Sequence, residues 1–106
     1  MLHPGAGEVR RAAKKDTSHN AIAEYLRKLG WSVADTHRQS DGFPDMVAGK
    51  PGWCCLIECK EPGKKLTPKE QVFAEMWTGP LIVAYSPEHA AEQLLFLSRG
   101  WMWTKT

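Results

Sequence analysis

The stretch GFPDMVAGKPGWCCLIECK, residues 42–60, decides the fold predicted for this chain. Two runs rich in apolar residues, at about 45–48 and 53–60, flank a segment Gly49-Lys50-Pro51-Gly52 that is typical of a tight turn. We therefore expect a β-hairpin. The second run is almost continuously apolar, which favours a central strand that is covered on both faces of its sheet.

A helix and a strand are expected before the hairpin. Four apolar residues recur at helical spacing, namely Ile22, Tyr25, Leu26 and Leu29. Residues 16–18 are each competent to cap the start of this helix, and Gly30 is suited to its C-terminus. A strand over about 31–37 then leads into a polar, glycine-containing segment.

A second helix is expected after the hairpin, because Thr67, Pro68 and Glu70 occupy the N-cap, first and third positions of a near-complete capping box. We expect it to end before Gly79 and to turn inward Val72, Phe73, Met76 and Trp77. A strand over 81–85 and a helix over about 86–97 follow. The order predicts one α/β domain over residues 16–106, with a mixed four-stranded sheet flanked by helices.

Composition narrows the class of protein. The chain has 106 residues, of which 42% are hydrophobic and 25% are charged, as in an ordinary globular domain. No apolar run approaches the roughly 18–20 residues of a membrane span, and the N-terminus has no apolar signal core. We therefore expect a cytosolic protein that has no membrane partner.

The basic residues gather in two clusters, although the net charge is only +2. Arg10, Arg11, Lys14 and Lys15 belong to a predicted N-terminal arm over residues 1–15. The second cluster comprises Lys60, Lys64 and Lys65. Arg38 lies in the loop before the hairpin. These positions are expected to contact nucleic-acid phosphates, and ordinary solvated surface charge is the open alternative.

Three cysteines, Cys54, Cys55 and Cys59, fall in one predicted strand. The odd number and close spacing fit neither a disulfide framework nor a zinc knuckle. We expect small buried apolar residues in a reducing cell.

Two acids and a lysine carry the predicted chemistry. Because side chains alternate along a strand, Glu58 and Lys60 share one face of the sheet, and the hairpin brings Asp45 beside Glu58. Two adjacent carboxylates repel each other unless a cation lies between them, and oxygen ligands favour Mg²⁺ or Mn²⁺. The backbone carbonyl of Cys59 is a further expected ligand. Lys60 would then lie beside an attacked phosphate, as in a metal-dependent phosphodiesterase. The open alternative is an exposed ion pair of Glu58 and Lys60, with Asp45 as a turn residue.

With these motifs the chain resembles the PD-(D/E)XK nuclease superfamily, most closely its small VRR-NUC-like branch, which includes compact phage proteins. The resemblance spans about residues 15–97 and rests on Gly42-Phe43-Pro44-Asp45, Leu56-Ile57-Glu58-Cys59-Lys60 and Leu66-Thr67-Pro68-Lys69-Glu70-Gln71. It implies a restriction-endonuclease-like αβββαβ(α) core and a metal-dependent DNA nuclease in a bacterial or phage-infected cytosol. In such a site Asp45 and Glu58 bind metal, Lys60 is catalytic and Gln71 contacts the site from its helix.

The resemblance also implies an acidic metal ligand from the first helix. Asp16, at the start of that helix, is the residue we choose, and a plain N-cap is its open alternative. Gln71 has the alternative of a surface residue on an amphipathic helix.

A chain this small favours a homodimer, which would serve the two strands of a branched DNA such as a Holliday junction or a flap. No small-molecule cofactor is expected. The alternatives are a catalytically inactive nucleic-acid-binding module on the same fold and a plain interaction domain.

Overall fold

The computed structural model describes residues 19–39 and 41–105, with side chains up to residue 100. Its elements are a first helix over residues 19–28, β1 (Ser32–Asp35), β2 (Met46–Lys50), β3 (Trp53–Cys59), α2 (Pro68–Met76), β4 (Leu81–Ala84) and α3 (Pro87–Lys105). This is the predicted order of elements. The predicted basic arm over residues 1–15, Asp16 and the start of the first helix lie outside the described residues.

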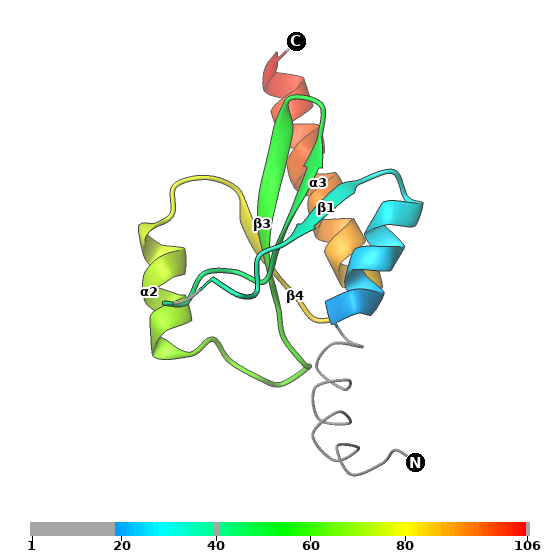
Figure 1. Ribbon diagram of the computed structural model, residues 1–106. Coiled ribbons are helices and arrows are strands. Elements are labelled where there is room, and N and C mark those ends of the chain that lie inside the picture. Colours follow the sequence, from blue (N-terminus) through cyan, green and yellow to red (C-terminus); the bar gives the residue numbers. More distant parts are fainter. Residues whose placement is uncertain (1–18, 40, 106) are drawn as a thin grey trace, which may run out of the picture.

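The four strands form one mixed sheet in the order β1-β2-β3-β4. The β1–β2 and β2–β3 pairs are antiparallel, whereas β3 and β4 are parallel. The first helix and α3 lie together on one side of the sheet, and α2 lies on the other (Figure 1). The predicted α/β class and the mixed four-stranded sheet flanked by helices are therefore confirmed.

The core lies between the sheet and the pair formed by the first helix and α3. It contains Ile22, Ala23, Leu26, Trp31, Met46, Ala48, Cys55, Ile57, Ile82, Ala84, Ala90 and Leu94. Gly30 ends the first helix in the left-handed region (φ 100°), and the N–H of Trp31 donates to the carbonyl of Leu26 at 3.0 Å. This bond closes the helix as predicted. No helix in the described part of the chain has both the length and the apolar character needed to cross a membrane.

Several boundaries differ from the prediction, and β1 ends at Asp35 rather than near residue 37. Strand β2 continues through Gly49 and Lys50, so only Pro51 and Gly52 form the hairpin turn. The final helix α3 extends to Lys105, beyond the predicted end near residue 97. For β2 and α3 the local turn and helix signals identified the element, but the strand pairing or the helix continued past the end that those signals predicted.

The orientation predicted for α2 is wrong. Within the described chain α2 buries none of its residues, and Val72 and Met76 remain 62% and 66% exposed. The helix ends at Met76, with Trp77 as its exposed C-cap, and only Phe73 of the four apolar residues is substantially covered. The ring of Phe73 packs against Phe43, with 5.1 Å between the ring centroids. Thus α2 packs on the loop before β2 rather than laying its apolar face on the sheet.

Gly42 allows this loop to approach α2. It adopts a left-handed conformation (φ 80°), which glycine reaches without the strain that a side chain brings. A Cβ at position 42 would overlap the backbone carbonyl of Lys69, in the first turn of α2. The next residues complete the contact, because Phe43 packs on α2 and Pro44 is fully buried. The Gly-Phe-Pro segment therefore sets the distance between β2 and α2.

We expect Gly42→Ala to destabilise the protein more than Gly63→Ala. Both glycines have positive φ (80° and 86°), but a Cβ at Gly63 would meet no described atom within 4 Å. Both substitutions therefore introduce backbone strain, but only Gly42→Ala adds a steric overlap of the new Cβ with the backbone of α2. We expect Gly42→Ala to lower the free energy of unfolding by about 2 kcal/mol more than Gly63→Ala, measured by urea denaturation. Equal losses would show that the α2 contact contributes nothing.

Candidate active site

The hairpin brings Asp45 and Glu58 together. Asp45 directly precedes β2, and its backbone N–H donates to the carbonyl of Ile57 at 3.0 Å. Its carboxylate atom Oδ2 accepts the backbone N–H of Cys59 at 2.8 Å. Asp45 is therefore bonded to the residues before and after Glu58 in the neighbouring strand. The predicted proximity of Asp45 and Glu58 is confirmed.

Glu58 is a buried acid, with only 5% of its surface exposed. Burial, the charge of Asp45 and a hydrogen bond to Glu70 together raise the pKa of Glu58 to about 9. Lys60 opposes this shift but does not cancel it. At neutral pH, Glu58 therefore keeps its proton unless a further cation approaches.

Glu70 is a member of the site that sequence reasoning missed. Its Oε1 atom lies 2.7 Å from Nζ of Lys60 and also accepts the backbone N–H of Thr67 at 2.8 Å. The second contact belongs to the capping box of α2, which the sequence did predict. No sequence spacing indicated that the same oxygen would also reach Lys60, because α2 and β3 meet only in the tertiary structure. We call Asp45, Glu58, Lys60 and Glu70 the acid–lysine cluster.

The charges of Lys60 and Glu70 stabilise each other. Burial opposes the ammonium, but the hydrogen bond from Lys60 to Glu70 and the surrounding acids outweigh it and raise the pKa of Lys60. Burial likewise opposes the Glu70 carboxylate, but its bonds to Lys60 and to the Thr67 N–H lower the pKa of Glu70. At neutral pH Lys60 is thus charged and held in one position beside Glu58.

The other predicted site residues lie elsewhere or are not described. Nε2 of Gln71 donates to Glu75 at 3.3 Å, and Gln71 lines an open hollow with Lys64 and Lys65. This hydrogen bond of Gln71 therefore lies outside the acid–lysine cluster. Arg38 is exposed in the turn after β1. Arg10, Arg11, Lys14, Lys15 and Asp16 lie outside the described residues, so their roles stay predictions.

The three cysteines differ in exposure. All are free; Cys55 is buried and Cys59 partly buried, but Cys54 is exposed, against the expectation that all three would be buried. Burial raises the pKa of Cys55 to about 12, and burial together with Asp45 and Glu58 also raises the pKa of Cys59. Cys55 and Cys59 are therefore thiols at neutral pH. The carbonyl of Cys59 as a metal ligand stays a prediction.

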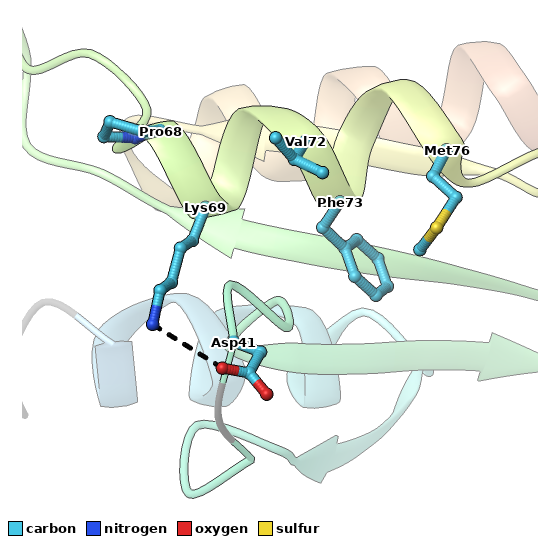
Figure 2. Close-up of a pocket in the computed structure, with 6 residues that line it drawn as sticks. All are labelled: Asp41, Pro68, Lys69, Val72, Phe73 and Met76. Atoms are coloured by element: carbon cyan, nitrogen blue, oxygen red, sulfur yellow. Dashed lines mark ion pairs between the residues drawn. The ribbon is translucent and has the colours of Figure 1, made fainter.

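An apolar hollow lies between α2 and the loop that carries Asp41 (Figure 2). Its volume is about 340 Å³, and it is lined by Asp41, Pro68, Lys69, Val72, Phe73 and Met76. Lys69 and Asp41 face each other at its edge, with 3.6 Å between Nζ and Oδ1. The hollow holds no residue of the acid–lysine cluster, so the apolar surface and the charged site are separate features.

The acid–lysine cluster fits a hard divalent cation. Three carboxylates, of Asp45, Glu58 and Glu70, face one ammonium, and burial together with the neighbouring acids raises the pKa of Glu58. Carboxylate oxygens are ligands that Mg²⁺ and Mn²⁺ prefer.

The sequence matches no protein-family model and no curated protein.

Proposed function

We propose that this protein is a Mg²⁺-dependent or Mn²⁺-dependent DNA endonuclease with a restriction-endonuclease-like αβββαβα core. The observation that carries the proposal is the meeting of Asp45, buried Glu58 and Lys60 at one end of the β2–β3 hairpin. The resemblance of these motifs to the PD-(D/E)XK nucleases, and to their VRR-NUC-like branch, supports it. The geometry alone supports a metal-dependent phosphodiesterase.

Asp45 and Glu58 would hold the ion, together with the carbonyl of Cys59. When bound, such an ion polarises a phosphoryl oxygen and lowers the pKa of a coordinated water. The ion would also take the place of the proton on Glu58, whose pKa is raised to about 9 by burial and by the charge of Asp45. The cluster is therefore better suited to the metal-bound state than to the metal-free state.

Lys60 would stabilise charge on the phosphate under attack. Its ammonium is charged and lies 2.7 Å from Glu70, which fixes its position from the first turn of α2. A positioned cation stabilises the oxygens that gain negative charge in the transition state. Glu70 acts through Lys60 and is a positioning residue.

The proposed substrate is DNA, bound through exposed basic side chains. Lys64 and Lys65 follow the end of β3, and Arg38 follows β1. Arg10, Arg11, Lys14 and Lys15 would add phosphate contacts from the N-terminal arm, Asp16 a further metal ligand, and Gln71 a contact from α2. A homodimer acting on branched DNA, in a reducing cytosol, completes the proposal. The exposed apolar side of α2 supports the homodimer, and the three free cysteines support the reducing cytosol.

We expect purified protein to cleave DNA only when Mg²⁺ or Mn²⁺ is added. Linear, nicked and four-way DNA would be titrated with each ion, and products measured on denaturing gels. Asp45→Ala should lower cleavage at least about 100-fold, because it removes a metal ligand. Asp41→Ala changes an exposed acid in the same loop and should cleave like the wild type.

A second function is favoured by one contact. Lys60 already pairs with Glu70 at 2.7 Å, as it would in a nucleic-acid-binding module that does not cleave. DNA binding without metal-dependent cleavage would support this module and contradict the nuclease. Light scattering on the same samples would measure whether two copies bind one junction.

A further inference from the structure

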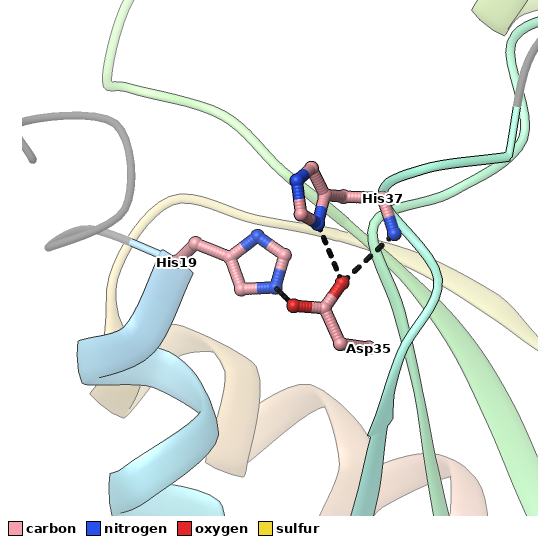
Figure 3. A group of neighbouring side chains, drawn as sticks. All are labelled: His19, Asp35 and His37. Atoms are coloured by element: carbon pink, nitrogen blue, oxygen red, sulfur yellow. Dashed lines mark hydrogen bonds and ion pairs between the residues drawn. The ribbon is translucent and has the colours of Figure 1, made fainter. Parts of the chain in front are cut away.

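A second group of metal-binding side chains lies on the other face of the sheet. His19 is in the first helix, Asp35 ends β1, and His37 follows two residues later (Figure 3). Asp35 pairs with Met46, so both side chains lie on the face that carries the core and the first helix. Asp45, one residue before Met46, points to the opposite face. The two groups are therefore separated by the sheet.

The spacing of the donor atoms suits a metal ion. One ligand atom from each of the three residues lies within 4.8 Å of the others. Nε2 of His19 is 3.5 Å from Oδ2 of Asp35, longer than the roughly 2.7–3.2 Å of a good hydrogen bond. Two ligands about 2.1 Å from one tetrahedral ion would be about 3.4 Å apart. The pair is thus spaced as two ligands of a shared ion would be.

The surroundings hold these ligands in place. His19 is only 6% exposed, so its imidazole has little freedom to move into solvent. The backbone N–H of His37 donates to Oδ1 of Asp35 at 2.9 Å, which orients the carboxylate and leaves Oδ2 toward His19. Nδ1 of His37 is 2.7 Å from the same Oδ1, and the two imidazole rings are 5.3 Å apart. A small rotation of His37 would direct Nδ1 toward an ion.

We propose that His19, Asp35 and His37 bind a divalent transition-metal ion, Zn²⁺ in the cell, with water as the fourth ligand. Two imidazole nitrogens and one carboxylate select zinc-like ions over Mg²⁺, and three protein ligands leave one position open. A bound ion would join the first helix to the end of β1 and to the loop that leads into Gly42. This site is independent of the proposed nuclease chemistry.

The test is titration of the chelator-treated, full-length chain with Zn²⁺ and Co²⁺ in the presence of excess Mg²⁺. We expect one high-affinity ion per chain and the visible absorption of four-coordinate Co²⁺, with no thiolate charge-transfer band. His37→Gln and Asp35→Asn should each weaken Zn²⁺ binding at least about 10-fold. His89→Gln is the matched control, because His89 lies in α3, where its Nδ1 accepts the N–H of Tyr85. Thermal unfolding would verify that each variant is folded.

Asp45→Asn separates this site from the acid–lysine cluster. It should keep Zn²⁺ binding while metal-dependent cleavage is lost. Zn²⁺ binding that survives both His37→Gln and Asp35→Asn, or that disappears in Asp45→Asn instead, would overturn the proposal. A chain that binds Zn²⁺ as expected but never cleaves DNA would contradict only the nuclease.

Discussion

Lys60→Met is expected to lower metal-dependent DNA cleavage about 10²–10³-fold, the usual loss when one positioned charge-stabilising donor is removed. Methionine matches the apolar stem of the lysine but lacks its ammonium. The ammonium of Lys60 lies beside Glu58 and is fixed by Glu70, so a cation elsewhere on the chain would not replace it. Single-turnover cleavage at saturating Mg²⁺ measures the effect on the chemical step.

Lys64→Met is the matched control, since Lys64 is an exposed lysine near the same strand end. It should weaken DNA binding modestly and leave the single-turnover rate nearly unchanged. Glu70→Gln should retain helix capping, because glutamine also serves at the third position of a capping box, but it releases Lys60. We expect a loss smaller than that of Lys60→Met. A Lys60→Met protein that cleaves at the wild-type rate would eliminate the proposed role of Lys60.

Glu58→Gln is expected to stabilise the metal-free protein at alkaline pH. The folded-state pKa of Glu58 is about 9, against an ordinary value of 4.5, so the folded state binds the proton more tightly than the unfolded state. Its contribution to stability is therefore complete below about pH 4.5 and is lost as the pH rises through about 9. Glutamine is neutral throughout and does not share this loss.

Thermal unfolding between pH 5 and pH 9 measures this difference. Relative to the wild type, Glu58→Gln should gain about 1–3 kcal/mol at the alkaline end, the penalty for a buried group whose charge is uncompensated. Mg²⁺ should raise the melting temperature of the wild type, most strongly at alkaline pH, and should have little effect on Glu58→Gln. Glu61→Gln changes an exposed neighbouring acid and should follow the wild type. A Glu58→Gln protein with the same pH profile as the wild type would contradict the raised pKa.

Much of the fold could be predicted because the signals are local. Pro51 and Gly52 specify a turn, and Thr67 with Glu70 specifies a helix start, in each case through atoms a few residues apart. The pairing of Asp45 with Glu58 also follows from a hairpin, in which the turn sets the register. These features require no knowledge of distant contacts.

The orientation of α2 was not predictable in this way. Its apolar residues have a helical period, and a period indicates that one face can be buried but not that a partner surface exists. The loop that carries Gly42 and Phe43 occupies the contact, which leaves Val72 and Met76 exposed. The exposed side of α2 is therefore a property of the packing.

The sequence by itself determined the element order, the hairpin and the meeting of Asp45, Glu58 and Lys60, because short-range backbone geometry controls all three. Only the tertiary structure decided that Glu70 joins Lys60, and that His19 meets Asp35 across the face of the sheet. Each of these contacts joins a helix to the end of a strand or to the residue that follows it. The packing angle and distance between such elements depend on the whole core, which no local pattern encodes.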